Sequence, residues 1–276
     1  MIITSYFSKD LFAGKTVFVT GGGSGINLGI ARNFAAVGAN VAICGRTQSK
    51  LDAASQELQA LGARVCAVVA DVRDMPALES AVATIATELG PIDVLVAGAA
   101  GNFLCPAERL SANGFKTVID IDLLGSFNAA RAAFEQLKAT RGSILFISAG
   151  QAFTPYAFQL HVAAAKSGID MMMRNLALEW GRYGIRVNSI APGPIEGTEG
   201  MRRLADPKLL AQFARTIPLQ RLGTVDDIGQ LAVFLTSPLA AYITGTLVVA
   251  DGGQNLPGSG LFNMGAEQML QAAGNR

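Results

Sequence analysis

The sequence predicts an α/β protein with a doubly wound, mostly parallel sheet of about seven strands in a single domain. Strand-like and helix-like patterns alternate along the chain, and the strand patterns are continuous apolar runs. Such runs are typical of strands buried on both faces, as in a parallel sheet covered by helices. The length of 276 residues, half of them hydrophobic, suits one large core. Right-handed crossovers then favour the Rossmann arrangement.

The expected elements follow one another with short connections. The first strand, Thr16–Thr20, leads through a glycine turn into a helix that ends near Val37, where Gly38 stops it. The later strands are expected at Asn40–Cys44, Arg64–Val69, Val94–Ala97, Gly142–Ile147, Ile185–Ile190 and Thr246–Val249. Helices are expected at Ser49–Leu61, Met75–Leu89, Ala112–Leu137, Phe158–Trp180, Pro207–Thr216 and Val225–Leu235. One domain, 1–276, is predicted, with its core at about 10–255 and mobile ends at 1–10 and about 257–276.

Composition and charge exclude several classes of function. The net charge is +1 and no basic run occurs, so nucleic acid is not an expected partner. No window approaches ~18 uninterrupted apolar residues and the first residues lack a secretion signal, so we expect a cytoplasmic protein without a membrane partner. Cys44, Cys66 and Cys105 have neither metal-binding nor CxxC spacing, which predicts free thiols and no metal site.

A glycine-rich turn follows the first expected strand and opens the first helix. Its residues are Gly21-Gly-Gly-Ser-Gly-Ile26. A turn without side chains lets backbone N–H groups and the helix N-terminus approach a pyrophosphate. We therefore expect a dinucleotide to bind Gly21, Gly23, Ser24, Gly25 and Ile26.

Arg46 stands at the end of the second expected strand, where dinucleotide-binding folds select their cofactor. An acidic residue there binds the ribose hydroxyls of NAD, whereas an arginine suits the 2′-phosphate of NADP. No acidic residue ends this strand, so NADP(H) is the expected cofactor. The alternative is an ordinary solvated arginine.

Several motifs together resemble the short-chain dehydrogenase/reductase family. They are Thr20-Gly-Gly-Gly-Ser-Gly25, Asn188-Ser-Ile-Ala-Pro-Gly-Pro194, Asp251-Gly-Gly253 and Lys166, the last at the place of the family's catalytic lysine. Asn27 replaces the third glycine of the family pattern. The resemblance implies that the cofactor also contacts Asp71, Lys166, Pro192, Gly193, Ile195 and Thr198.

One branch of that family matches more closely. The stretches Ala99–Pro106, Phe115–Asp122 and Ala191–Gly200, with Arg202-Arg203, are similar to the peroxisomal type of 2,4-dienoyl-CoA reductase. That branch also has His followed five residues later by Lys, as His161 and Lys166 are here. The resemblance implies NADPH use and an acyl-CoA substrate, with Arg73 and Arg203 at the CoA phosphates and Phe103, Ser111 and Asn113 at the acyl and pantetheine end.

The missing catalytic groups agree with this chemistry. The family's tyrosine and serine are replaced by Val162 and Ala149. A ketone reductase needs an acid for the alkoxide oxygen, whereas a reduced enoyl thioester takes its proton on carbon and needs mainly an oxyanion stabiliser. Asp122 and Lys166 remain, and the resemblance makes them the catalytic pair. Asp122 could instead bond neighbouring backbone at a helix kink.

Two alternative functions stay open from the sequence. Tyr156 could replace the missing donor in a reductase of another carbonyl or enoyl substrate. The chain could also be a catalytically silent NADP-binding protein. His161 is expected to be a packed, hydrogen-bonded structural residue rather than a catalytic one.

The two long apolar helices resemble those that pair across subunits in this family. This resemblance predicts a homo-oligomer, most simply a tetramer.

Overall fold

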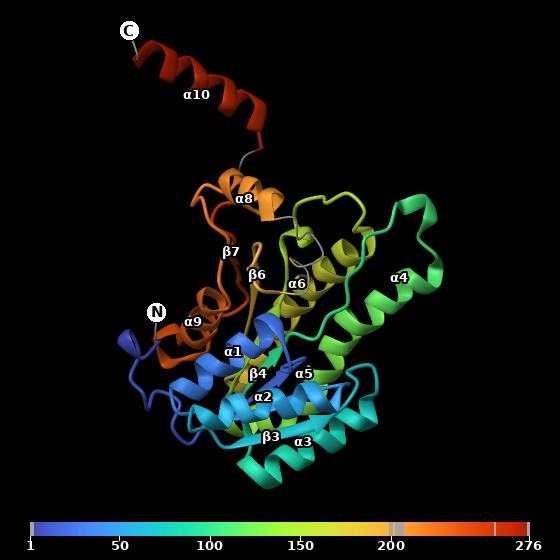
Figure 1. The fold of residues 1–276 in the computed structure, drawn as a ribbon. Coiled ribbons are helices and arrows are strands. Elements are labelled where there is room, and N and C mark those ends of the chain that lie inside the picture. Colours follow the sequence, from blue (N-terminus) through green and yellow to red (C-terminus); the bar gives the residue numbers. More distant parts are fainter. Residues whose placement is uncertain (1–2, 199–200, 202–206, 257, 275–276) are drawn as a thin grey trace.

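A computed structural model describes residues 3–198, 201, 207–256 and 258–274. Its centre is a seven-stranded sheet in the order β3-β2-β1-β4-β5-β6-β7, with every neighbouring pair parallel (Figure 1). The strands are β1 (Thr16–Thr20), β2 (Asn40–Gly45), β3 (Val65–Val69), β4 (Ile92–Ala97), β5 (Ser143–Ile147), β6 (Arg186–Pro192) and β7 (Leu247–Ala250). The predicted fold class is confirmed.

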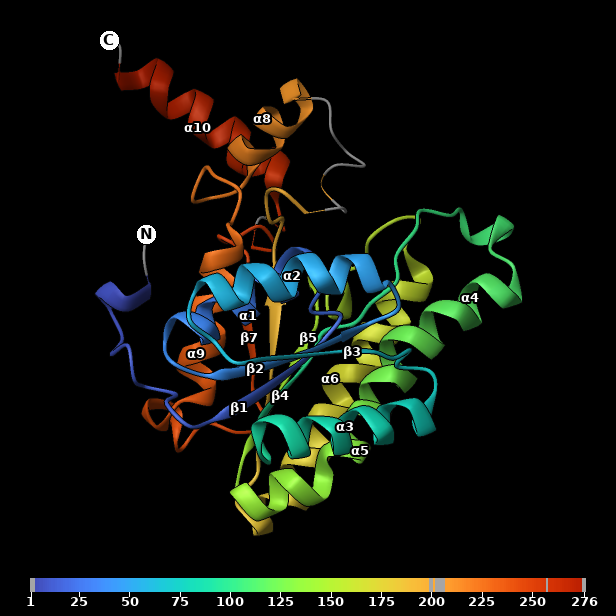
Figure 2. The same cartoon turned by 60° about the horizontal axis from the view of Figure 1, so that its bottom comes forward.

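Helices cover both faces of the sheet (Figure 2). They are α1 (Gly25–Ala36), α2 (Gln48–Ala60), α3 (Met75–Leu89), α4 (Ala112–Val118), α5 (Gly125–Thr140), α6 (Leu160–Trp180), α8 (Pro207–Thr216), α9 (Val225–Thr236) and α10 (Gly260–Gly274). Short 3₁₀ turns lie at Ile3–Ser5, Ala107–Arg109, Gly150–Ala152, Gly181–Tyr183 and Pro238–Ala240. Helices α1, α2 and α9 pack on one face, and α3, α5 and α6 pack on the other.

Alternate residues of each strand contribute to two separate apolar layers. In β1, Val17 and Val19 face the layer of α1, α2 and α9, whereas Phe18 faces α3, α5 and α6. All five β1 side chains are buried. Because both faces are covered, the strand has no polar alternation, which is the pattern that predicted a parallel sheet.

The long helix expected at 112–137 is interrupted. Residues Ile119–Leu124 form a π-helical turn between α4 and α5, and the hydroxyl of Ser126 donates to the carbonyl of Asp122 at 2.6 Å. Such wide turns often occur at functional sites, because they change the direction of one side chain. Here the turn contains Asp122, whose side chain is buried.

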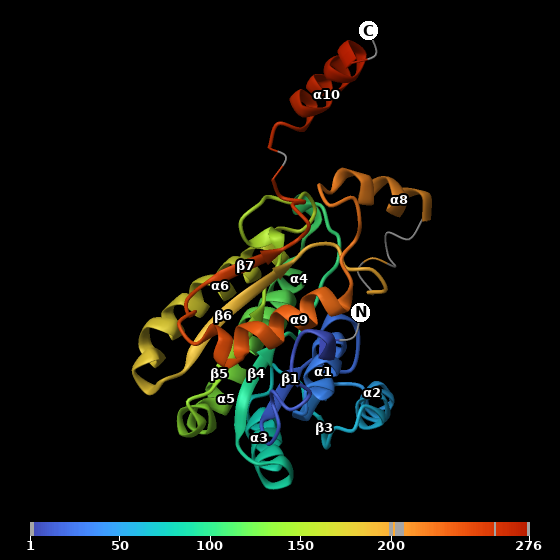
Figure 3. The same cartoon turned by 90° about the vertical axis from the view of Figure 1, so that its left-hand side faces the viewer.

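Both ends of the described chain contain regular structure. Residues Gly260–Gly274 form α10, which extends away from the body of the domain (Figure 3). At the other end, Ile3 is buried in the layer of α1 and α9. The predicted mobility of both ends stays a prediction. Within the described part of the chain, no helix is long and apolar enough to cross a membrane.

Candidate active site

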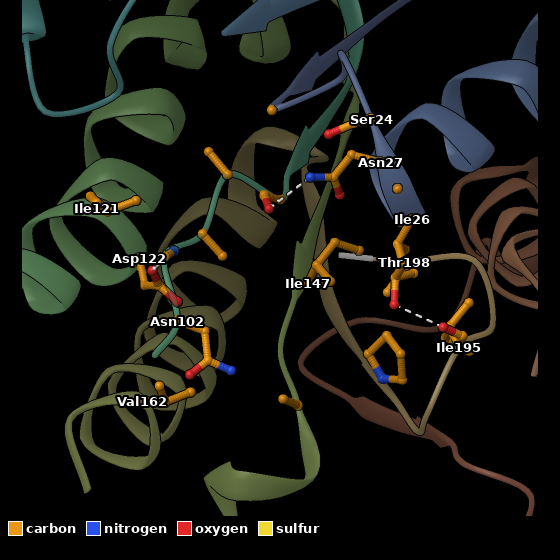
Figure 4. A pocket seen from close by; sticks show the side chains of 18 of the residues that line it. Ser24, Ile26, Asn27, Asn102, Ile121, Asp122, Ile147, Val162, Ile195 and Thr198 are labelled. Carbon is orange, nitrogen blue, oxygen red and sulfur yellow. Dashed lines mark hydrogen bonds between the residues drawn. The ribbon is translucent and has the colours of Figure 1, made fainter. Parts of the chain in front are cut away.

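A cavity of about 890 Å³ opens at the carboxyl ends of the strands (Figure 4). In a doubly wound sheet this is the edge at which ligands bind. Its lining includes every residue expected to contact the cofactor: Gly21, Gly23, Ser24, Gly25, Ile26, Arg46, Asp71, Lys166, Pro192, Gly193, Ile195 and Thr198. The predicted catalytic residue Asp122 lines the same cavity.

The glycine turn has the backbone geometry that a pyrophosphate requires. Gly21 has φ +67° and Gly25 has φ +60°, both in the left-handed region. A Cβ atom at Gly21 would lie 3.0 Å from Cα of Ala99. Ser24, the N-cap of α1, makes no capping bond with its side chain, so that side chain does not occupy the first N–H groups of the helix. These residues fit the diphosphate of a nicotinamide dinucleotide.

Asn27 couples this turn to the end of β4. Its amide donates to the carbonyl of Gly98 at 2.8 Å, and a Cβ at Gly98 would come within 2.2 Å of the Asn27 side-chain oxygen. Asn27 therefore lacks the backbone flexibility of a third glycine, but its side chain forms a hydrogen bond that links the glycine turn to the end of β4. The sequence showed the departure at Asn27 but not this bond.

Two cations lie at the end of the cavity formed by β2 and α2. Arg46 and Lys50 both line it, together with Thr47. Neither Arg46 nor Lys50 makes an ion pair with a described residue. An unpaired arginine and lysine side by side suit a phosphate. Lys50 was not identified from the sequence.

Asp71 and Arg73 form a close ion pair after β3. Nη2 of Arg73 lies 2.6 Å from Oδ2 of Asp71, and its Nε also donates to this carboxylate. Hydrogen bonding from the Arg73 guanidinium lowers the pKa of Asp71. Asp71 lines the cavity, but Arg73 does not. Arg73, predicted to contact the CoA phosphates, is thus bound to Asp71 in this structure.

Asp122 and Lys166 form a buried ion pair at the centre of the cavity. Oδ2 of Asp122 is 3.2 Å from Nζ of Lys166, and their side chains are 1% and 7% exposed. Lys166 also donates to the carbonyl of Ile147 at 3.0 Å. The other Asp122 oxygen, Oδ1, accepts the backbone N–H of Gly101 at 2.7 Å. Since Oδ2 makes no directed hydrogen bond, its contact with Lys166 is mainly ionic.

The groups that could replace the missing tyrosine and serine are engaged elsewhere. Val162 and Ala149 line the cavity at those two positions. Ser148 donates its hydroxyl to Oδ2 of Asp170 at 2.9 Å. Tyr156 donates to Oδ1 of Asn255 at 3.2 Å, and burial, followed by the charge of Asp251, raises the pKa of its phenol.

A chain of amides lines the part of the cavity beyond Val162. Gln151 donates to Gln159 at 2.8 Å, and Gln159 donates to Asn102 at 3.2 Å. We call this part, lined by Asn102, Gln151, Tyr156, Gln159 and Val162, the substrate end of the cavity. The amide chain joins segments before and after β5, which single-sequence patterns do not reveal.

The residues expected at the acyl and pantetheine end lie next to this region. The ring of Phe103 packs on the imidazole of His161, with centroids 4.3 Å apart. The Ser111 hydroxyl caps α4 by accepting the N–H of Gly114 at 3.0 Å, and Asn113 lies in the first turn of that helix. None of Phe103, Ser111 and Asn113 lines the cavity itself. Arg203 lies outside the described residues.

His161 differs from its expected role. It is packed as predicted, with no exposed surface, but neither ring nitrogen hydrogen bonds to a described residue. The prediction that His161 is packed is therefore confirmed, whereas the prediction that it is hydrogen bonded is wrong. Elsewhere in the described chain, no three His, Cys, Asp or Glu side chains gather in a way that could hold a metal ion.

Comparisons with known proteins agree with this geometry. The family model described as enoyl-(acyl carrier protein) reductase matches residues 21–255. A crystal structure of a short chain dehydrogenase from Bacillus anthracis superimposes with a TM-score of 0.81 at 42% identity, covering 89% of this chain and 98% of that one. The chain belongs to the short-chain dehydrogenase/reductase family.

Two further members of this family narrow the comparison. The peroxisomal 2,4-dienoyl-CoA reductase of Saccharomyces cerevisiae, named as (3E)-enoyl-CoA-producing, is 47% identical over 88% of this chain and 85% of its own length. An NADPH-bound short chain oxidoreductase from Pseudomonas aeruginosa, described as having an atypical catalytic center, has a TM-score of 0.84 at 30% identity, covering 89% of this chain and 98% of that one. The short-chain dehydrogenase/reductase fold thus occurs with nicotinamide cofactors and with altered catalytic groups.

Proposed function

We propose that this protein is an NADPH-dependent reductase of 2,4-dienoyl-CoA thioesters. The observation that carries the proposal is the buried Asp122–Lys166 pair in a cavity whose tyrosine and serine positions hold Val162 and Ala149. Such a site stabilises negative charge but places no free hydroxyl at the reacting carbonyl. The names of relatives up to 47% identical support the same substrate class.

The product in the names of the yeast and rat relatives, a (3E)-enoyl-CoA, defines where hydrogen is added. Conversion of a 2,4-dienoyl thioester into a 3-enoyl thioester adds one hydrogen at C5 and one at C2, leaving the double bond between C3 and C4. Bound NADPH supplies the hydride for C5. The displaced electron pairs move along the conjugated chain to the thioester oxygen, and a proton then adds at C2.

Asp122 and Lys166 serve the second half of this reaction. The Lys166 ammonium places positive charge beside the developing oxyanion and holds the nicotinamide ribose. Asp122 orients Lys166 through their 3.2 Å contact and holds the backbone of Gly101 at the cavity wall. Its carboxylate also holds the water that delivers the proton to C2.

An assay of NADPH oxidation tests the proposed function directly. We expect turnover with 2,4-hexadienoyl-CoA, a 3-enoyl product by mass spectrometry and NMR, and no turnover with a panel of simple ketones. Turnover of ketones alone would favour the alternative in which Tyr156 replaces the missing donor. NADPH binding without turnover of either class would favour a catalytically silent protein.

The cofactor preference gives a second prediction. NADPH should bind at least about tenfold more tightly than NADH, because Arg46 lines the cavity without a carboxylate partner. Arg46→Ala should remove the preference and leave NADH binding unchanged, as measured by quenching of intrinsic fluorescence. Arg32→Ala is the matched control, since Arg32 pairs with Glu57 outside the cavity and should not alter either dissociation constant. Equal affinities in the unaltered protein would contradict the assignment.

The CoA contacts stay predictions. Arg73 has only part of its guanidinium engaged with Asp71, so a phosphate can be bound by its remaining donor. Phe103, Ser111 and Asn113 stay predicted contacts of the acyl and pantetheine end, and Arg203 stays a predicted contact of the CoA phosphates.

Exposed apolar side chains on the paired long helices support a tetramer. Leu124, Phe127, Met171 and Leu178 are 42%, 46%, 55% and 82% exposed, on the α5 and α6 side of the domain. Large apolar side chains exposed on one side of a domain are typically covered in an oligomer. Light scattering should give a mass near four times 28.7 kDa at micromolar concentration. A monomer under these conditions would refute the prediction.

The predicted cellular location of this chain differs from the location named for its relatives. The names of the yeast and rat relatives place those proteins in peroxisomes. The cytoplasmic location expected for this chain stays a prediction, which microscopy of a fluorescent fusion can test.

A further inference from the structure

The buried imidazole of His161 is not explained by the fold. It has no exposed surface, and Nδ1 and Nε2 both lack a hydrogen-bond partner among the described residues. A buried polar group left without a partner costs about 1–3 kcal/mol, so an apolar side chain would suit this position better if packing were its whole role.

The position of His161 relates it to the reacting groups. It lies in the first turn of α6, directly before Val162, which lines the cavity, and five residues before Lys166. The ring of Phe103 covers it at a centroid distance of 4.3 Å, and Phe103 itself is 36% exposed. The neighbours of Phe103 in the chain, Asn102 and Leu104, both line the cavity. The imidazole is therefore in contact, through the ring of Phe103, with a chain segment that lines the cavity.

Three other side chains at the substrate end each already donate a hydrogen bond. Gln151 and Gln159 donate along the amide chain, and Tyr156 donates to Asn255. The backbone N–H of Gly101 is held by Asp122. In contrast to these side chains, His161 has no hydrogen-bond partner at either ring nitrogen among the described residues.

We propose that His161 donates a hydrogen bond to the thioester carbonyl oxygen of the bound acyl-CoA after the acyl chain displaces the ring of Phe103. This inference rests on the proposed function and adds the oxyanion donor that Val162 and Ala149 do not provide. As electrons move from the conjugated chain to the thioester oxygen, the N–H of His161 stabilises the negative charge opposite Lys166. The imidazole transfers no proton in this step, and the proton for C2 comes from the water held by Asp122.

The first test separates this role from packing. His161→Phe keeps an aromatic ring against Phe103 but removes both nitrogens. We expect kcat with 2,4-hexadienoyl-CoA to fall by about a hundredfold, the usual scale for losing one oxyanion donor. The dissociation constant of NADPH should stay within twofold, and thermal stability should be equal or higher because no buried polar group is left unpaired. The control, Met173→Leu, changes a buried α6 residue outside the site and should leave kcat unchanged.

The second test uses the fact that the chain contains one histidine. In an untagged, ¹⁵N-histidine-labelled protein every imidazole signal comes from His161. A dead-end complex with NADP⁺ and 2,4-hexadienoyl-CoA should shift one ring nitrogen toward a hydrogen-bonded donor, whereas NADP⁺ with CoA alone should not.

These measurements decide the inference even if His161→Phe fails to fold, because the NMR experiment needs no substitution. Unchanged imidazole signals in the ternary complex, or a His161→Phe variant with kcat within threefold of the unaltered protein, would overturn it. Failure of the unaltered protein to reduce dienoyl-CoA would instead refute the proposed function, while the NMR titration would still show whether His161 meets a thioester.

Discussion

Lys166→Ala and Asp122→Ala should each lower turnover with 2,4-hexadienoyl-CoA by about a hundredfold or more. The proposed function places the buried Lys166 ammonium beside the reacting carbonyl, and Asp122 lies 3.2 Å from it while accepting the N–H of Gly101. Loss of an electrostatic or acid–base group of this kind typically costs about 10²–10⁴-fold in rate. Steady-state kinetics at saturating NADPH measures the effect.

Two further variants identify which property of these residues is required. Asp122→Asn keeps an oxygen for the Gly101 N–H but removes the charge beside Lys166, so it separates charge from shape. We expect it to fold, since asparagine is the usual residue at this position in the short-chain dehydrogenase/reductase family, and to lose most of the activity.

Tyr156→Phe serves as the comparison. Its phenol is bonded to Asn255 and its pKa is raised by burial, so removing the hydroxyl should cost much less. Should Tyr156→Phe abolish turnover while Asp122→Asn leaves it intact, the Asp–Lys mechanism is wrong and the displaced-tyrosine alternative replaces it.

The fold was predictable because its signals are local. Most strands are short apolar runs without polar alternation, and such runs are typical of a sheet covered on both sides. Positions near Thr20, Arg46 and Asp71 were then predicted to meet, since the carboxyl ends of parallel strands lie at one edge. The cavity lining brings them together.

Several features of the site depend on contacts that no local pattern records. The apolar periodicity from Ala112 to Leu137 does not show that the helix widens into a π turn at Asp122. The pairing of Arg73 with Asp71 follows from backbone direction after β3. The stacking of Phe103 on His161 joins a loop to a helix 58 positions later in the chain. A sequence names such residues as candidates, whereas only the packing shows which donors are already engaged.

The Asp122–Lys166 pair also predicts a large effect on stability. Removing one member of a buried ion pair leaves an uncompensated charge and costs about 3–5 kcal/mol, whereas replacing both members by apolar residues is often neutral or stabilising. The two side chains are 1% and 7% exposed, so this cost for breaking a buried ion pair applies to them. Asp122→Leu and Lys166→Met should each lower the free energy of unfolding by that amount.

The double variant, Asp122→Leu with Lys166→Met, should be more stable than either single variant, short of the unaltered protein only by the lost partners of the Gly101 N–H and the Ile147 carbonyl, and should have no measurable turnover. Urea unfolding of the cofactor-free protein at fixed concentration measures these changes. Lys15→Met is the control, because Lys15 pairs with Asp93 at the surface and is half exposed, and such pairs contribute about 1 kcal/mol or less. If both single variants lose less free energy of unfolding than Lys15→Met, Asp122 and Lys166 do not form a desolvated ion pair. If instead the double variant is stable and inactive, the pair is retained for its chemistry, because apolar residues would serve the fold equally well.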